Sequence, residues 1–499
     1  MSEPSAAPPA RLTTARQDPI RGGAYVLYWM VAYRRTGWNF ALEHAAQRAR
    51  SLEFPLLVLE PLRCGYRWAS ARHHHFVIDG MADNASILGK SAVSYYPYVE
   101  TVPGAGKGLL RKLAASAALV VADDYPAFFL PRMVAAAVEQ LDCRLELVDS
   151  NGLLPIRQAD RTFKTAYSFR RYLQNELHEH LDDMPAAEPL ADLELPGLEP
   201  LSDEIMQRWP ATEPATLQQP EQLIAGLPID QSVAALDDER GGSITGSRRL
   251  ERFLATGLDG YLSDRNRLDG AATSGLSPYL HYGHVATHQI VAALAQHEGL
   301  VGFDPEPTGR GQRTGWWNAS EQAEAFLDQL VTWREIGFNM CQRDPDYDTF
   351  ESLPGWAQQT LHEHGQDARP HTYTIEELDR SETHDELWNA AQNQLRHEGR
   401  IHNYLRMLWG KKILEWSPTP ELALATMLEL NNKYALDGRD PNSTSGICWV
   451  LGRYDRAWGP ERPIFGKIRY MTSENTARKM RVGDYIRRYC DHPPSSRPG

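Results

Sequence analysis

A polar amide and a large aromatic ring occur one helical turn apart in residues 326–339, FLDQLVTWREIGFN. Gln329 and Trp333 are four positions apart, so on a helix they occupy neighbouring positions of one face. Such a patch is either part of the core or the wall of a pocket. The pair alone does not decide between these two interpretations.

Hydroxyl side chains gather before Pro278 in residues 273–283, TSGLSPYLHYG. Thr273, Ser274 and Ser277 precede a proline that is typical of the first turn of a helix. Hydroxyls and free backbone N–H groups at such a position suit a phosphate or a diphosphate. Plain capping of the helix is the simpler alternative, and these residues alone favour it.

A second polar segment, residues 430–449, lies between a helix and an apolar run. It contains Asn431, Asp437, Arg439 and Asp440, and Arg406 in NYLRML can pair with one of its acids. Polar groups this dense at the end of an element are more typical of a ligand site than of a solvent turn.

Three tryptophans are placed where they can conduct electrons. Trp409 and Trp416 in WGKKILEW are seven residues apart, about 10.5 Å of rise along one helix face, and Trp388 precedes them. Indoles at such separations can pass an electron stepwise, but core packing is the commoner role of buried tryptophans. On these residues alone, packing is favoured.

The elements that must position these residues fall into two parts. From 24 to about 150, β-rich runs such as AYVLYWM, PLLVLEPL and ALVVADD alternate with helical stretches, which indicates a doubly wound parallel sheet. Residues 186–245 are rich in Pro, Glu, Asp and Ala and read as an interdomain linker. We predict a flexible arm over 1–20, an α/β domain over 21–185, the linker over 186–245, a larger all-α domain over 246–490 and a tail over 491–499.

Charge is distributed unevenly over the 499 residues, whose net charge is −13. Residues 181–240 carry fourteen acids against two arginines, whereas residues 451–490 carry ten Lys and Arg against four acids. A basic C-terminal region is compatible with phosphate binding, although a solvated charged face is the commoner explanation.

Several classes of protein are disfavoured. No apolar run reaches the roughly 18 residues of a membrane span, and residues 1–20 lack the apolar middle of a secretory signal. The five cysteines form no C-x-x-C pair, which predicts neither a disulfide framework nor a metal site. The consecutive His73, His74 and His75 cannot all bind one metal from a helix, and we expect them to be a surface cluster. A cytoplasmic monomer without a membrane partner is expected.

The segments TSGLSPYLHYG, THDELWNAAQ, HNYLRMLWGKKILEWSP, LNNKYALDGRDPN and ERPIFGKIRYM together resemble the photolyase and cryptochrome family, specifically the class II cyclobutane pyrimidine dimer photolyases. The resemblance covers essentially all of 246–475, and before that mainly AYVLYWM and the βα alternation. It implies a light-driven carbon–carbon lyase that repairs DNA.

The resemblance also implies a cofactor and the residues that hold it. FAD would lie U-shaped in the helical domain, with Asn431 facing flavin N5 and Arg406 and Asp437 forming an ion pair beside the isoalloxazine. The phosphate end would lie at Tyr261, Thr273, Ser274 and Ser277, and Leu276 would also belong to the cofactor site. Trp388, Trp409 and Trp416 match the family's electron-transfer tryptophans, which favours the electron-transfer role over packing. An antenna pigment of unknown identity is expected in the N-terminal domain.

The implied partner is damaged DNA. A dimer flipped out of the duplex would meet the flavin, because a lesion buried in the base stack cannot reach it. Excited, reduced FAD would give the dimer one electron and receive it back after the ring splits. Trp333 and Trp449 match the indoles that flank the lesion, worth about 1–3 kcal/mol of stacking per base. Met407 would contact the lesion, and Arg456 and Arg469 would fill the gap or hold the strand.

The sequence departs from this family at the lesion-binding position. Gln329 stands where the family has a glutamate that binds the pyrimidine edge, and an amide carries no charge. Asp328 and Glu335 point elsewhere on a helix, about 100° and 240° away. Asn403, Leu408 and Gly410 replace Gly, Tyr and Ala, and the stretch before Asp455 is one residue short. A signalling photoreceptor and a flavoprotein with another substrate therefore stay open as alternatives.

Overall fold

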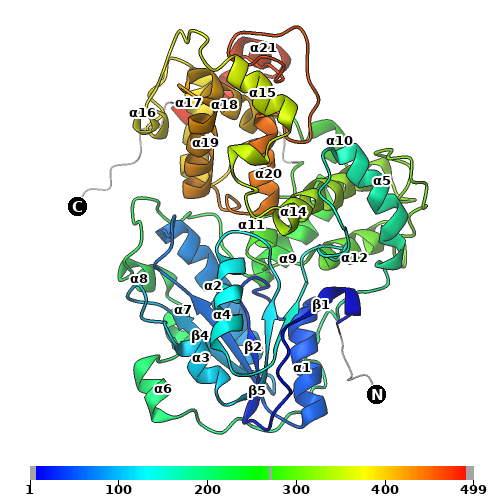
Figure 1. Ribbon diagram of the computed structural model, residues 1–499, viewed down its shortest axis with the longest axis vertical. Helices are drawn as coiled ribbons and strands as arrows, with labels where there is room; N and C mark the ends of the chain where they lie inside the picture. Colours follow the sequence, from blue (N-terminus) through cyan, green and yellow to red (C-terminus); the bar gives the residue numbers. More distant parts are fainter. Residues whose placement is uncertain (1–6, 269–271, 491–499) are drawn as a thin grey trace.

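A six-stranded sheet forms the first part of the chain in the computed structural model, which describes residues 7–268 and 272–490 (Figure 1). The strand order is β1-β6-β5-β2-β3-β4, parallel except for β1, which pairs antiparallel with β6. The strands are β1 (Leu12–Arg16), β2 (Tyr25–Trp29), β3 (Leu56–Leu62), β4 (Ser94–Val99), β5 (Ala117–Asp123) and β6 (Leu145–Val148). The predicted doubly wound parallel sheet is confirmed.

Helices cover both faces of this sheet. Alternate side chains of β2 enter two separate cores, Val26 and Tyr28 on one side and Tyr25, Leu27 and Trp29 on the other, as the two-residue period of a strand requires. The core that contains Val26 and Tyr28 also contains α1 residues, and the core that contains Tyr25, Leu27 and Trp29 also contains α3 and α4 residues. The helices of this part are η1 (Pro9–Arg11), α1 (Phe40–Leu52), α2 (Ala71–Leu88), α3 (Leu109–Ala114) and α4 (Leu130–Gln140).

Two predictions about this part were wrong. Leu12–Arg16, predicted within a flexible arm, form β1, because pairing with β6 satisfies their backbone groups at the sheet edge. His73, His74 and His75, predicted at the surface, are all buried in α2, and their rings bond carbonyl, hydroxyl and carboxylate oxygens. The predicted tail over 491–499 and the first six residues of the arm lie outside the described residues.

The predicted linker runs along the sheet part and contains three short helices, α6 (Asp203–Arg208), α7 (Pro214–Leu217) and α8 (Pro220–Ala225). Helices α7 and α8 pack on α2. Trp209 is buried, and its indole N–H donates to the Ala105 carbonyl at 2.8 Å. Single apolar side chains thus anchor a segment that has almost no helical periodicity.

The rest of the described chain is largely helical, as predicted (Figure 1). Helix α5, expected in the first domain, packs on η4 through an Arg170–Asp328 ion pair of 2.7 Å. The helices are α5 (Ala166–Glu176), η2 (Leu177–Glu179), α9 (Ser243–Arg252), η3 (Phe253–Gly257), α10 (Tyr261–Asp264), α11 (Ser277–His281), α12 (Thr287–His297), α13 (Glu321–Leu327), η4 (Asp328–Trp333), α14 (Arg334–Arg343), η5 (Phe350–Ser352), α15 (Gly355–Glu363), α16 (Ile375–Asp379), α17 (Glu386–Glu398), α18 (Asn403–Trp416), α19 (Pro420–Tyr434), α20 (Pro441–Val450), α21 (Ser473–Lys479) and α22 (Gly483–Cys490).

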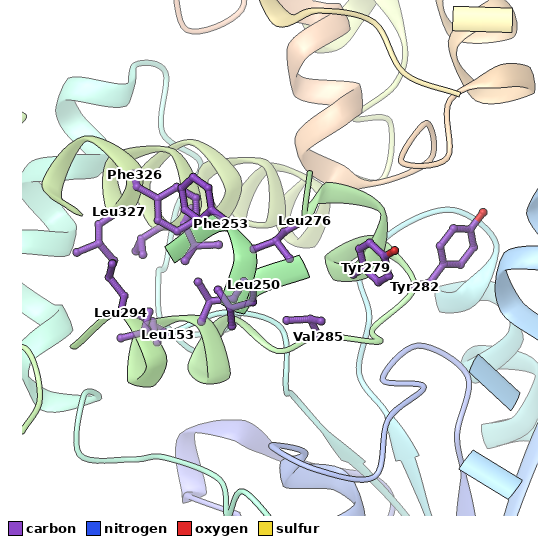
Figure 2. Close-up of a cluster of buried hydrophobic side chains, with 14 of the residues drawn as sticks. Leu153, Leu250, Phe253, Leu276, Tyr279, Tyr282, Val285, Leu294, Phe326 and Leu327 are labelled. Carbon is purple, nitrogen blue, oxygen red and sulfur yellow. The ribbon is translucent and has the colours of Figure 1, made fainter. Parts of the chain in front are cut away.

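Two hydrophobic cores hold this helical part together. Figure 2 shows Leu276 directed into the first core, with Leu250, Phe253 and Phe326, so the segment before α11 is anchored by an apolar side chain. The second core contains all three predicted electron-transfer tryptophans. Within residues 7–268 and 272–490, no helix has the length and apolar character needed to cross a membrane.

Candidate active site

A continuous series of polar contacts links the two segments that were expected to bind one cofactor. The Ser277 hydroxyl donates to Asp437 Oδ2 at 2.5 Å, and Asp437 Oδ1 lies 3.7 Å from Arg406 Nη2. Arg406 Nη1 lies 3.4 Å from Ser443 Oγ, which also accepts from Asn431 Nδ2 at 3.1 Å. Four helices (α11, α18, α19 and α20) and the loop before α20 thus meet at one polar cluster, which consists of Ser277, Arg406, Asn431, Asp437 and Ser443.

Proline and capping residues position the members of this cluster. Pro278 lies in the first turn of α11, and Pro441 begins α20, whose N-cap Asp440 accepts from the Asn442 N–H at 2.8 Å. Ser443 lies on the first turn of α20, and the sequence reasoning missed it. The signal was the run Asp-Pro-Asn-Ser, a capped helix start carrying a hydroxyl.

The cluster fits a ligand with polar groups. Arg406 Nε is buried and has no hydrogen-bond partner, which is a cost unless a ligand acceptor meets it. Asn431 is only 1% exposed, and its amide N–H₂ also donates to the Gly438 carbonyl at 3.0 Å, so its orientation is held. These donors, an ion pair and a neighbouring hydroxyl suit the polar edge of a flavin.

The expected phosphate end is only partly assembled at this cluster. Ser274 Oγ accepts from the Leu276 N–H at 3.4 Å, and Leu276 is buried, whereas Thr273 is exposed. Tyr261 packs against Phe253 and Phe326, with ring centroids 5.8 and 5.4 Å away. No described contact joins Tyr261 to the cluster, so its predicted role stays a prediction.

The three tryptophans form a buried series that begins on the helix of Arg406. The Trp388 indole N–H donates to the Trp409 carbonyl at 3.0 Å, and the Trp388 and Trp416 ring centroids are 5.4 Å apart. The Trp409 indole N–H donates to Gln392 Oε1 at 2.9 Å. Hydrogen bonds thus fix the orientation of two of the three rings.

Gln329 and Trp333 lie in a π-helical stretch, η4, rather than in a regular α-helix. Wider turns of this kind are rare and occur frequently at functional sites. Trp333 and Trp449 are both half-buried, with ring centroids 5.4 Å apart and planes inclined by 39°. The structure therefore brings the two predicted lesion-flanking indoles together, one from η4 and one from α20.

Neither neighbouring acid replaces the missing glutamate. Asp328 is paired with Arg170. Glu335 is buried and accepts from the backbone N–H groups of Leu153 and Leu154, at 2.8 and 3.1 Å. Burial raises the pKa of Glu335 to about 7. The Asp328 carboxylate thus joins η4 to α5, and the Glu335 carboxyl group joins α14 to the backbone of Leu153 and Leu154.

The predicted DNA-binding arginines are also brought together. Arg456 and Arg469 are both exposed, and their guanidinium carbons lie 4.8 and 5.2 Å from the Trp458 ring centroid. Trp458, which the sequence reasoning missed, donates its indole N–H to Asp455 at 3.2 Å. Met407 is half-buried at the edge of the second core.

The three departures of α18 occupy different environments. Asn403 begins the helix and is exposed, while Leu408 is buried in the second core. Gly410 permits close packing, because a Cβ there would lie 2.7 Å from Val450 Cγ2.

A separate pocket of about 740 Å³, mouth included, opens at the carboxyl ends of β2, β3 and β5. This is the edge where open α/β sheets bind ligands. Aromatic and cationic side chains line it from both parts of the chain: Arg34, Arg63, Tyr66, Phe128, Tyr282 and Arg439. Among the described residues, no group of three or more His, Cys, Asp or Glu is placed to hold a metal ion.

Comparison with known proteins identifies the family. A deoxyribodipyrimidine photo-lyase of Methanothermobacter thermautotrophicus is 34% identical over 475 residues, 95% of this chain and 96% of that protein. The chain belongs to the deoxyribodipyrimidine photo-lyase family. The expectation of a photolyase-like enzyme is thereby confirmed. A second family member, from Oryza sativa subsp. japonica, is 33% identical over 93% of this chain and 87% of its own length.

The fold of this photolyase-family chain also has a solved counterpart. A bacterial class III photolyase from Agrobacterium tumefaciens superposes with a TM-score of 0.68 at 16% identity, covering 95% of this chain and 88% of that one. At this identity the likeness concerns the fold alone. No protein-family model matches the chain.

Proposed function

We propose that this enzyme binds FAD and uses blue light to split cyclobutane pyrimidine dimers in DNA, as an enzyme of the class II type. The observation that carries the proposal is the arrangement of α18. This one helix carries Arg406 of the polar cluster and, three and ten residues later, Trp409 and Trp416. A rise of about 1.5 Å per residue places Arg406 and Trp416 about 15 Å apart along the helix axis.

The polar cluster supports the cofactor assignment. Arg406 and Asp437 would flank the isoalloxazine, Asn431 would hydrogen bond its central ring, and Ser274 and Ser277 would lie toward the diphosphate. Bound and reduced FAD would supply the excited electron that dimer splitting requires. The contribution of the chain is a set of oriented donors around Arg406 Nε, which has no protein partner.

The lesion site is supported by the indole pair and the basic surface. Trp333 and Trp449 would stack on a flipped-out dimer, with Met407 and Gln329 against its edges, and Arg456 and Arg469 would bind the strand phosphates. Gln329 offers one acceptor and two donors to a pyrimidine edge. The division into an α/β domain over 21–185 and a catalytic domain over 246–490, and action as a cytoplasmic monomer, belong to the same proposal.

The pocket beside the sheet supports an antenna pigment. Its flat aromatic walls and three arginines suit a planar anionic chromophore, and Arg439 Nε is buried there without a partner. It lies between the two parts of the chain rather than within the first part alone, because His281, Tyr282 and Arg439 line it.

A second candidate is a flavoenzyme of this fold with a different substrate. Gln329 favours it, because neither Asp328 nor Glu335 can supply the missing carboxylate. The proposal is tested by blue-light repair of a dimer-containing oligonucleotide by the reduced protein and by Gln329→Glu. Repair by the unchanged protein supports the first function. Repair by Gln329→Glu alone supports the second, and repair by neither contradicts the first.

A further inference from the structure

Two polar aromatic side chains cover the far end of the tryptophan series. The Tyr373 ring centroid lies 5.1 Å from that of Trp416, and the His384 ring centroid lies 5.5 Å from it, both approximately edge to face. These separations match the 5.4 Å between Trp388 and Trp416. Tyr373 therefore continues the series with a ring spacing close to that of the last tryptophan step.

Trp416 itself has almost no contact with solvent. It is 2% exposed, whereas Tyr373 is half-buried and His384 is exposed. A reductant in solution therefore cannot touch the Trp416 ring, but it can reach Tyr373. Any electron that enters the series from outside has to cross this covering layer or travel farther through protein.

The Tyr373 hydroxyl is set for proton transfer. It lies 2.6 Å from His384 Nδ1, to which it donates when the imidazole carries its proton on Nε2, and it accepts from the His384 backbone N–H at 3.0 Å. The acceptor role requires an imidazole that is unprotonated at Nδ1. Burial and the neighbouring His371 and Lys412 lower the pKa of His384, while Asp385 and Glu415 oppose this, so the neutral form of the imidazole is favoured. His371 stacks on it at 3.9 Å.

A cation disfavours a positive charge at Trp416. Lys412 Nζ lies 5.6 Å from its ring centroid, and Lys412 is itself paired with Glu415 at 3.0 Å and Asp385 at 3.6 Å. The ammonium opposes an oxidised indole, and the two carboxylates reduce this effect. The ammonium thus favours moving the oxidising equivalent one ring outward only to the extent that the two carboxylates leave its charge unneutralised.

We propose that Tyr373 and His384 form the terminal redox relay of this enzyme, through which an external thiolate refills the tryptophan series. In the first step Tyr373 gives one electron to the oxidised Trp416 radical cation and its phenolic proton to His384 Nδ1. The products are neutral Trp416, a Tyr373 phenoxyl radical and a protonated imidazole. In the second step the thiolate gives one electron to the phenoxyl oxygen, the imidazolium returns the proton, and a thiyl radical leaves.

This inference rests on the proposed function, so its test separates the two. Wild type, Trp409→Phe, Trp416→Phe and Tyr373→Phe are illuminated with bound FAD and a thiol, and formation of reduced flavin is followed by absorption. Tyr167→Phe is the matched control, because Tyr167 is an exposed tyrosine of α5. We expect Tyr373→Phe to slow thiol-dependent reduction about tenfold, which corresponds to an activation barrier about 1.4 kcal/mol higher. Tyr167→Phe should leave it unchanged.

Three further measurements test the relay directly. Electron paramagnetic resonance of protein with ring-deuterated tyrosine should show a tyrosyl radical in the wild type and a tryptophan radical in Tyr373→Phe. Nuclear magnetic resonance of the unilluminated protein should show a higher pKa of His384 in Tyr373→Phe, because the donor to its neutral form is gone. His384→Gln should slow reduction and, with the thiolate concentration held constant across the pH series, remove its decline at acid pH, which in the wild type follows protonation of the acceptor.

Failure of the proposed function and failure of the relay give different results. Absence of photoreduction in the wild type contradicts the proposed function. Photoreduction that Trp409→Phe blocks but Tyr373→Phe leaves unchanged in rate and radical identity overturns the relay while leaving the proposed function intact.

Discussion

Trp333 and Trp449 contact each other, with ring centroids 5.4 Å apart, although one ends a π-helical stretch and the other lies on α20. This spacing is that of an aromatic pair in direct contact, which contributes about 0.5–1.5 kcal/mol. A base cannot lie between rings this close. Lesion binding therefore requires the two indoles to separate or the dimer to rest against their outer faces.

Replacement of Trp333 by alanine should weaken binding of dimer-containing DNA. The stacking that is removed is about 1–3 kcal/mol per base, so Kd should rise roughly 5- to 150-fold. Fluorescence anisotropy with damaged and undamaged oligonucleotides of one sequence measures this. A comparable weakening for the undamaged strand would contradict a lesion-specific role.

How far the sequence predicts this site depends on whether a feature is local. The run around Pro278 and the polar loop carrying Asp437 each contain their own helix-start signals, and their residues do meet, as the Ser277–Asp437 bond shows. The alternating strands of the first part are equally local, since each carries an apolar run that both faces bury.

Features that depend on distant partners escaped prediction. Whether Leu12–Arg16 form a strand depends on β6, more than a hundred residues away. The burial of His73–His75 depends on oxygens from distant segments, among them the Ala435 carbonyl. The π-helical stretch at Gln329 has no signature in a pattern of apolar residues, because only one additional residue in the turn distinguishes it.

Replacement of Asp437 by asparagine should reduce FAD retention. The carboxylate accepts from Ser277 and faces Arg406, and an amide removes the charge from both interactions. Loss of a charged hydrogen bond costs about 1.5–3 kcal/mol, so the Kd for FAD should rise roughly 10- to 150-fold. Absorption of the purified variant and a flavin titration measure this. Asp259→Asn, an exposed acid near α10, is the control and should bind FAD like the wild type.

The two arginines beside Trp458 should bind DNA without reading its sequence. Replacement of Arg456 or Arg469 by glutamine should reduce the slope of log K against log salt by about 1 for each DNA phosphate that the variant no longer neutralises. Damaged and undamaged strands should weaken alike. Arg487→Gln, which changes an exposed arginine of α22, should leave the slope unchanged. Weaker binding of damaged DNA alone would instead assign these arginines to the lesion.

Glu335 should make the stability of the protein fall as the pH rises toward 8. Burial raises its pKa to about 7 in the folded chain, above its ordinary value of 4.5. The folded state then binds more protons than the unfolded state between these two values, so the contribution is fully present below pH 4.5 and is lost as pH rises through 7. The loss corresponds to about 3 kcal/mol.

Glu335→Gln should flatten this dependence, which thermal unfolding between pH 5 and 8 measures. The amide keeps one acceptor for the Leu153 N–H but cannot accept from both backbone groups, so the variant should be less stable at pH 5 and closer to the wild type at pH 8. Glu351→Gln, at an exposed carboxyl group, should leave the profile unchanged. Because a Cβ on Gly152 would lie 2.6 Å from Glu335 Oε1, Gly152→Ala should lower Tm at every pH. An unchanged pH profile in Glu335→Gln would show that this carboxyl group is already ionised in the folded protein at pH 5.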